Sequence, residues 1–293
     1  MTATNIIFLD IPTVLPVPFS PNTWKVRLAL NYKKLTYVTR WVETTDIASV
    51  CKSLGIPPTS TSPDGTPKYT LPALIDHTTS PPALLSDSTP IIEYLERTYP
   101  DPDPSLALCA PASRALHALF EYHVAHSITA LLLPVMVMHM HDRKTPRDRI
   151  HFRKRTEAAF GKKLEDIELR GKEREEHWKK IEGAFDLLAM FMQAGGTAGE
   201  LFTGSNLSLA DCTLGGLLLA FRYISPDEAW IKVSVWNDGK WMRYVAALEE
   251  WTGCSINSLS IDGKRFLQGS DLSIIGLLQR FSNYTSSNRK SEG

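Results

Sequence analysis

The sequence predicts an α+β protein, with an N-terminal domain in the order βαβ-α-ββα and an all-helical C-terminal domain. Two observations support this prediction. Over residues 5–99, short runs of β-branched and aromatic side chains alternate with helix-like segments. After the proline-rich stretch 100–104, nearly every segment has helical character. A mixed half followed by a helical half indicates two packed layers of different kinds.

The 293 residues divide into four regions. Residues 1–100 are expected to form the N-terminal domain, 101–108 a linker and 109–255 the helical domain. The remaining residues, 256–293, are rich in Ser, Asn and Gly, and we expect a partly disordered C-terminal extension there. A chain of this length accommodates two modest domains.

Local patterns predict the N-terminal elements. The apolar run Ile6–Leu9 is typical of a buried strand. Ser20 followed by Pro21 favours the start of a helix ending near Tyr32, since Ser is a good N-cap and Pro a good first helical residue. Further strands are expected at 35–42, 69–76 and 83–85, a loop at 55–68, and further helices at 46–54 and 88–99, the last capped by Ser88.

The helical half is expected to contain four long segments. They span residues 112–143 with a bend at Pro134, 151–193 with a break near Gly171, 208–221, and 236–251.

Composition excludes several functional classes. Lys plus Arg equals Asp plus Glu at 32 each, so no basic excess favours nucleic acid. No basic leader precedes the first apolar run, and the longest apolar stretch, Ile128–Met138, falls short of the roughly 20 residues that span a bilayer. The 4 cysteines form no C-x-x-C pair. We therefore expect a soluble cytoplasmic protein that binds neither nucleic acid nor membrane.

Histidines in the first long helical segment have metal-like spacing. They are His123, His126, His139 and His141. No carboxylate-rich ligand set accompanies them, so ordinary helical histidines are the favoured interpretation and no metal is expected.

Ser20 is the first candidate for chemistry. A helix N-terminus has unpaired N–H donors and a partial positive charge, and a hydroxyl there can donate to a thiolate and lower its pKa. Lowering a thiol pKa by about two units requires about 2.7 kcal/mol. A hydrogen bond to the charged sulfur supplies about 1.5–3 kcal/mol and the dipole about 0.3–1 kcal/mol. The alternative is that Ser20 is only an N-cap.

Two further candidates lie in the same half. If the Leu71–Pro72 bond is cis, the backbone N–H and C=O of Leu71 are exposed at a strand edge, although cis bonds are a small minority of X-Pro bonds. Asp87 and Ser88 form another helix N-terminus, suited to a carboxylate, and Asp87 can pair with an ammonium group. The alternative for this pair is simple capping.

Together these features match the three polar ends of an extended γ-glutamyl tripeptide, and they carry a family resemblance. Residues 5–99 resemble the thioredoxin-like domain of glutathione transferases, through the segments 20–27, 69–74 and 87–95. They look most like the fungal etherase-like (fungal-specific class A) transferases and bacterial β-etherases. Ser208–Asp211 resembles the capping box of the family's helical domain. The resemblance covers about residues 5–255.

The resemblance implies a glutathione transferase of the detoxification type, with glutathione as co-substrate and a homodimer as the assembly. Ser20 would be the catalytic, thiol-activating residue. The glutathione-binding residues would be Asn22, Lys68, Leu71, Pro72, Asp87 and Ser88. Because Ser rather than Cys occupies position 20, direct attack of the glutathione thiolate on an electrophile is expected instead of thiol–disulfide exchange.

The co-substrate is expected to be a small hydrophobic aromatic electrophile, with β-aryl ether cleavage as a candidate reaction. Its pocket is predicted to include Trp24, Tyr122, His126 and Tyr223. The alternating residues Met136, Met138 and Met140 are either core filling or a soft apolar wall. Two other functions stay open: a non-catalytic ligandin that carries aromatic or polyphenolic compounds, and a regulatory protein that uses the fold only as a scaffold.

Overall fold

A computed structural model of the chain describes residues 2–196, 198–253 and 258–259. Its N-terminal half is built on a five-stranded sheet in the order β6-β5-β1-β2-β7. β1 pairs in parallel with β2 and antiparallel with β5, which in turn pairs antiparallel with β6. The strands are β1 (Thr2–Asp10), β2 (Leu35–Trp41), β5 (Ala73–Asp76), β6 (Ala83–Ser86) and β7 (Ser258–Leu259). Apart from β7, the expectation for the extension 256–293 falls outside the described residues.

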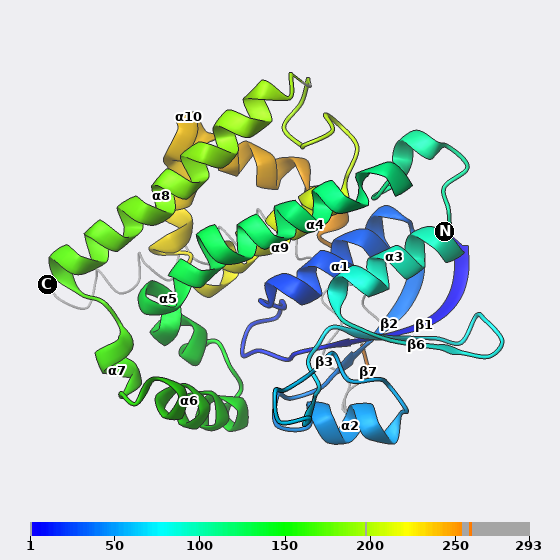
Figure 1. Cartoon of the computed structure of the whole chain (residues 1–293), viewed down its shortest axis with the longest axis horizontal. Coiled ribbons are helices and arrows are strands. Elements are labelled where there is room, and N and C mark those ends of the chain that lie inside the picture. Colours follow the sequence, from blue (N-terminus) through cyan, green and yellow to red (C-terminus); the bar gives the residue numbers. More distant parts are fainter. Residues whose placement is uncertain (1, 197, 254–257, 260–293) are drawn as a thin grey trace, which may run out of the picture.

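Helices cover both faces of the sheet (Figure 1). α1 (Pro21–Tyr32) and α3 (Ser88–Thr98) lie on one face, and α2 (Ile47–Ser53) lies on the other. Successive strand residues point to opposite faces, so Phe8 joins the cluster under α1, and Leu9 joins the cluster with Ile47 under α2. The predicted order βαβ-α-ββα is confirmed.

Several details of this half differ from the prediction. The expected loop 55–68 contains a short hairpin of β3 (Ser60–Thr61) and β4 (Pro67–Lys68). The third strand begins at Ala73 rather than Tyr69, because Pro72 has no N–H to donate to the ladder. The cap of α3 is Asp87, whose carboxylate accepts from the Ser88 N–H at 2.7 Å, so Ser88 is the first helical residue and not the cap.

The second half is helical, as predicted. Its helices are α4 (Arg114–His123), the π-helical turn η3 (Val124–Thr129), α5 (Ala130–Asp142), α6 (Pro146–Phe160), α7 (Leu164–Ile167), α8 (Gly171–Ala194), α9 (Leu209–Ile224) and α10 (Ala229–Ala247). Single-turn 3-10 helices lie at η1 (Pro104–Leu106), η2 (Pro111–Ser113) and η4 (Glu249–Trp251).

The long segments depart from the prediction where local signals were misjudged. The first contains the π-helical turn η3 in addition to Pro134, which lies inside α5. The second consists of three helices, α6, α7 and α8, and α6 ends at Gly161 in a left-handed conformation. α8 begins at Gly171, so the break expected there is confirmed. The last begins at Ala229 rather than Trp236, and the left-handed run 237–239 kinks it at the position where we expected it to begin.

The combined helix Arg114–Asp142 is 29 residues long and apolar enough, by length and composition, to cross a membrane. Core helices of globular proteins pass the same test. This helix contacts α8 and α9, and Val124, Ile128 and Val135 belong to the main hydrophobic core.

α9 is the central helix of the helical half. Its N-terminus is closed by the predicted capping box, in which Ser208 accepts from the Asp211 N–H and Asp211 accepts from the Ser208 N–H. Asp211 is fully buried and also accepts from the Phe202 N–H and the Tyr244 hydroxyl. Burial raises the pKa of Asp211, and the donated hydrogen bonds oppose that shift.

α9 also joins the two halves by packing on α1. A Cβ added at Gly216 would lie 2.4 Å from the Pro21 carbonyl oxygen, so only glycine permits this approach of the two backbones. Pro21 is the first residue of α1. The helical half therefore rests directly against the helix turn that follows Ser20.

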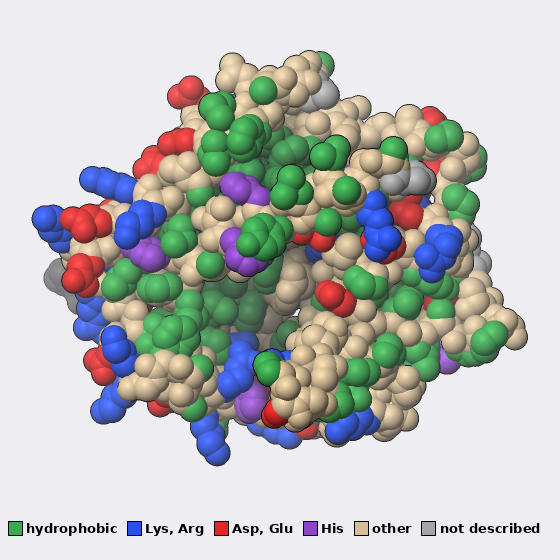
Figure 2. Space-filling model, viewed as in Figure 1, with side chains coloured by type: hydrophobic (Ala, Val, Ile, Leu, Met, Phe, Trp, Pro, Cys, Tyr) green, Lys and Arg blue, Asp and Glu red, His purple; other side chains and the backbone are tan. Residues whose placement is uncertain are grey.

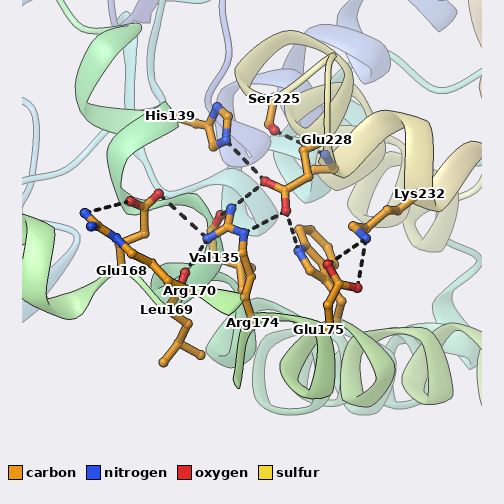
Figure 3. A network of polar contacts seen from close by, with 12 residues as sticks. Val135, His139, Glu168, Leu169, Arg170, Arg174, Glu175, Ser225, Glu228 and Lys232 are labelled. Atoms are coloured by element: carbon orange, nitrogen blue, oxygen red, sulfur yellow. Dashed lines mark hydrogen bonds and ion pairs between the residues drawn. The ribbon is translucent and has the colours of Figure 1, made fainter. Parts of the chain in front are cut away.

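A polar clasp of His139, Arg174, Trp178 and Glu228 joins α5, α8 and α10 (Figure 3). Arg174 Nε and Trp178 Nε1 donate to the same Glu228 oxygen, at 2.7 and 2.8 Å. Arg174 also donates to the Val135 carbonyl at 2.6 Å. Burial disfavours the charged form of Glu228, but the hydrogen bonds from Arg174 and Trp178 outweigh it and lower the pKa of Glu228.

Candidate active site

Ser20 occupies the N-cap position of α1 without capping it. Its carbonyl accepts from the Trp24 N–H at 3.0 Å and from the Thr23 hydroxyl at 3.1 Å, but its own side chain makes no cap hydrogen bond. Thr145 and Ser208, in contrast, both accept from the backbone of the helices they cap. The Ser20 side chain therefore does not cap α1, and its hydroxyl is available to a ligand at a helix N-terminus.

Trp24 supports the loop that leads into Ser20. Its indole N–H donates to the Pro18 carbonyl at 2.9 Å, and its side chain has no exposed surface. Tyr223 of α9 stacks on Trp24 with ring centroids 5.8 Å apart. Trp24 thus lies behind the site, although we expected it in the electrophile pocket.

The Leu71–Pro72 peptide bond is cis. Within the described residues, neither the N–H nor the C=O of Leu71 has a hydrogen-bond partner, although Leu71 is only 5% exposed. A buried backbone amide without a partner is costly, so a ligand that pairs with both groups would be favoured there. This is the arrangement expected for an extended peptide backbone.

Asp87 lies directly beside Pro72. Its N–H donates to the Pro72 carbonyl at 3.2 Å, and its backbone is left-handed with φ 74°. Ser88 is buried at the first turn of α3. The structure therefore brings the predicted strand edge and the second helix N-terminus together.

The other predicted glutathione contacts are exposed. Asn22 lies on the first turn of α1, close in sequence to Ser20. Lys68 lies on the β3–β4 hairpin, where its carbonyl accepts from the Thr59 N–H at 2.8 Å. Neither side chain is held by a hydrogen bond or ion pair to another described residue, so both are available to a ligand.

A partly buried polar network behind Ser88 was not predicted from the sequence. Lys25 of α1 donates to the Thr89 hydroxyl at 2.7 Å and forms an ion pair with Glu121 of α4. The Thr89 hydroxyl donates to the Glu121 carboxylate at 2.8 Å, and the Thr213 hydroxyl of α9 lies 3.4 Å from the same carboxylate. The network ties α1 and α3 to the helical half. No local signal marks it, because its members are distant in the sequence.

A hollow opens between α5 and the N-terminal end of α1, and hydrophobic side chains form its floor (Figure 2). Tyr122 and His126 are exposed on α4 and η3 and stack on each other with ring centroids 3.8 Å apart. The Nδ1 atom of His126 lies 2.8 Å from the Tyr122 carbonyl. Tyr223 is half-buried against Trp24, so it contributes at most an edge to a pocket.

A second concave region lies away from this site, in the helical half. It is a cavity of about 700 Å³ between the end of α8 and α10, lined by residues such as Asp186, Asn237 and Lys240, and it includes nothing from the N-terminal half. Among the described residues, no three His, Cys, Asp or Glu side chains group as metal ligands.

Comparison with known proteins gives consistent matches. Residues 16–103 match the family model for the glutathione S-transferase N-terminal domain, and residues 115–251 match the model for its C-terminal domain. A curated relative, the glutathione S-transferase-like protein ustS of Aspergillus flavus, is 29% identical over 263 residues, which is 83% of this chain and 90% of the relative.

Solved structures agree with these matches. A glutathione S-transferase of Ceriporiopsis subvermispora, determined in complex with glutathione, is 40% identical with a TM-score of 0.77, covering 84% of this chain and 97% of its own. Glutathione transferase GSTFuA3 of Phanerochaete chrysosporium is 34% identical with a TM-score of 0.76, over the same shares of the two chains, 84% and 97%.

Proposed function

Because the chain belongs to the glutathione S-transferase family and is a glutathione transferase, we propose that Ser20 activates its glutathione thiolate for attack on a hydrophobic aromatic electrophile. The observation that carries this proposal is the Ser20 hydroxyl, which stands at the N-terminus of α1 and makes no cap hydrogen bond. A donor and a helix dipole at one point stabilise a sulfur anion.

The rest of the site supports glutathione in an extended conformation. The free N–H and C=O of Leu71 would pair with the cysteinyl backbone. The N-terminus of α3 at Ser88 would hold the γ-glutamyl carboxylate, and Asp87 would hold its ammonium group. Asn22 would give a second donor near the sulfur, and Lys68 would meet the glycyl carboxylate.

In the proposed reaction the thiolate sulfur forms a bond to the electrophilic carbon, and the leaving group departs with the electron pair of the bond that breaks. A halide or a phenoxide fits this scheme, so β-aryl ether cleavage is the candidate physiological reaction. The apolar hollow beside the N-terminal end of α1 would hold the aromatic ring (Figure 2). The exposed, stacked Tyr122 and His126 would contact it.

The test is the ultraviolet absorbance of the bound glutathione thiolate against pH. We expect a thiol pKa well below that of free glutathione in the wild type, and loss of that depression in Ser20→Ala. Turnover should fall about 10²–10³-fold, as when one donor to an anion is removed. Ser53→Ala, which changes an exposed serine on α2, is the control. Unchanged turnover and thiolate pKa in Ser20→Ala would remove Ser20 from the mechanism.

A ligandin is the second candidate function. The apolar floor of the hollow and the stacked Tyr122 and His126 can bind planar aromatic compounds without any reaction. Calorimetric titration with a polyphenol, with and without glutathione, distinguishes the two functions. Tight binding together with an undepressed thiol pKa would favour carriage, and no binding would eliminate it.

A homodimer is the proposed assembly. α4 exposes Leu116 and Leu119, at 69% and 66%, on the surface of the helical half. Large exposed side chains of this kind favour a protein contact. Light scattering of the purified chain measures the mass directly, and a monomer at micromolar concentration would overturn this assembly.

A further inference from the structure

Lys144 differs from the other buried cations in the described part of the chain. Lys25, Arg27 and Lys144 are 4%, 0% and 8% exposed. Lys25 pairs with Glu121, and Arg27 pairs with Asp10 at 2.8 Å. The Lys144 ammonium has neither an ion pair nor a hydrogen bond with a described residue. An ammonium group is normally buried only with a compensating partner.

Two aromatic rings flank the Lys144 ammonium. Its Nζ atom lies 5.1 Å from the ring centroid of Phe19 and 5.0 Å from that of Phe152. These contacts stabilise the charge but accept none of its three N–H groups as a carboxylate would. Phe19 directly precedes Ser20 in the chain. The unpartnered charge therefore lies beside the segment that carries the catalytic serine.

The backbone fixes this position. Lys144 forms an isolated β-bridge with Thr13, and the Val14 N–H donates to the Arg143 carbonyl at 3.0 Å. The turn after α5 is thus attached to the loop between β1 and α1. Figure 2 shows basic side chains below the hollow.

The carboxylate whose charge acts on Lys144, that of Asp148, already has other partners. Asp148 accepts from the Thr44 N–H at 2.8 Å, the Thr44 hydroxyl at 2.9 Å and the Thr45 N–H at 3.3 Å. Burial lowers the pKa of Lys144, and the charge of Asp148 only partly opposes that shift. An anionic oxygen supplied from the hollow would satisfy the ammonium where Asp148 does not.

We propose that Lys144 is a specificity-determining residue that binds a carboxylate of the electrophile, so that aromatic acids are the preferred co-substrates. The inference rests on the proposed function, because it places the electrophile beside Ser20. Phe19 and Phe152 would flank the carboxylate end of the planar substrate, and the reacting carbon would lie toward the sulfur. This residue would select among electrophiles without taking part in thiolate formation.

A matched pair of electrophiles tests the proposal: 4-chloro-3-nitrobenzoate and its methyl ester. In both compounds the thiolate displaces chloride from the ring carbon, and only the first compound is an anion. In Lys144→Met, kcat/KM for the benzoate should fall about 10- to 100-fold, the value of a hydrogen bond to a charged group. For the ester it should change less than about threefold. The KM for glutathione and the pKa of its bound thiol should stay unchanged.

Two further variants complete the experiment. Lys144→Arg keeps the charge and should retain most of the preference for the benzoate over the ester. Lys162→Met, which removes an exposed lysine after α6, should behave as the wild type. The preference is a ratio measured within one variant, so it stays interpretable when Lys144→Met lowers the amount of folded protein.

Three outcomes would overturn the proposal. An equal fall in kcat/KM for the two electrophiles would show that Lys144 contributes only to packing. A raised thiol pKa would mean that it acts on the sulfur, and an unchanged preference would remove it from the site. Calorimetry measures binding of the benzoate in the absence of glutathione. It therefore tests the role of Lys144 independently of the role of Ser20 in activating the thiol. Weaker binding to Lys144→Met would support the role of Lys144 even if Ser20 were found not to activate the thiol.

Discussion

At the scale of single residues, serines and threonines at helix N-termini perform different tasks in this chain. Ser208 and Thr145 accept hydrogen bonds from the helix backbone, whereas Ser20 keeps its hydroxyl for other partners. Trp24 fixes the chain path before Ser20 through the Pro18 carbonyl. A residue type in a capping position therefore does not determine whether it caps.

The charge of Asp87 gives a prediction at this scale. Asp87→Asn removes the proposed partner of the γ-glutamyl ammonium, while Asn tolerates the left-handed backbone and still accepts from the Ser88 N–H. We expect the KM for glutathione to rise about tenfold with kcat unchanged, the pattern of a lost ground-state contact. Steady-state kinetics measures this, with the exposed Asp227→Asn as control. A fall in kcat at constant KM would contradict the assignment.

The sequence marked those candidate site residues whose signals are local. Each signal is a pair of adjacent residues that marks a helix start or a strand edge: Ser20–Pro21, Leu71–Pro72 and Asp87–Ser88. Lys144 and Glu121 were not predicted, because only tertiary packing brings them to Phe19 and Lys25. Trp24 was placed on the wrong side of the loop, since spacing along a helix does not show which face is covered.

At the scale of elements, Glu228 holds α5, α8 and α10 together (Figure 3). Glu228→Gln should lower the free energy of unfolding by about 1–3 kcal/mol at pH 7, because Arg174 and Trp178 lose a charged acceptor in a partly buried site. Glu175→Gln, which breaks a more exposed pair with Lys232, should cost less than about 1 kcal/mol. Denaturant unfolding of both variants checks the difference, and equal costs would refute the clasp.

The pH dependence of the clasp has a definite sign. Its hydrogen bonds lower the folded-state pKa of Glu228 below the ordinary 4.5, so ionisation favours the folded state above that pH. This stabilisation is lost as the pH falls from 4.5 through the folded-state pKa. The difference in unfolding free energy between the wild type and Glu228→Gln should therefore shrink in this acidic range.

Element types were predicted well in this chain, and element ends less well. The π-helical turn η3 has no Gly or Pro that would reveal it, and it interrupts a segment that reads as a regular helix. The kink at 237–239 has a visible Gly239, but the chain resumes its helix afterwards, so the sequence signal marked a start where the structure has an interruption. Both irregularities are tolerated because neighbouring helices pack against them.

At the scale of the whole molecule, the contact between α1 and α9 couples stability to the position of Ser20. Gly216→Ala would place a Cβ 2.4 Å from the Pro21 carbonyl oxygen and force the two backbones apart. We expect a loss of about 1–3 kcal/mol in unfolding free energy. We also expect at least a tenfold lower kcat/KM, because displacing a catalytic group by about 1 Å can cost 10²-fold in rate.

Gly183→Ala is the matched control for this prediction. Gly183 lies within α8, and a Cβ added there would meet no atom within 4 Å. The substitution should therefore stabilise the protein by about 0.5–1 kcal/mol and leave the kinetics unchanged. Thermal unfolding and steady-state kinetics measure both variants. Normal kinetics in a destabilised Gly216→Ala enzyme would show that the serine position is independent of the interface.

The approach of α9 to α1 also sets the smallest part of the molecule that can be exchanged between relatives. A chimera that joins the N-terminal half of one transferase to the helical half of another brings parts of the two parents together at two places. One is the covalent junction near residues 101–108, and the other is the packing contact between Pro21 and Gly216. Only the second lies beside Ser20. We therefore expect a recombinant enzyme to stay active when α1 and α9 come from the same parent, because only then do the two helix surfaces match.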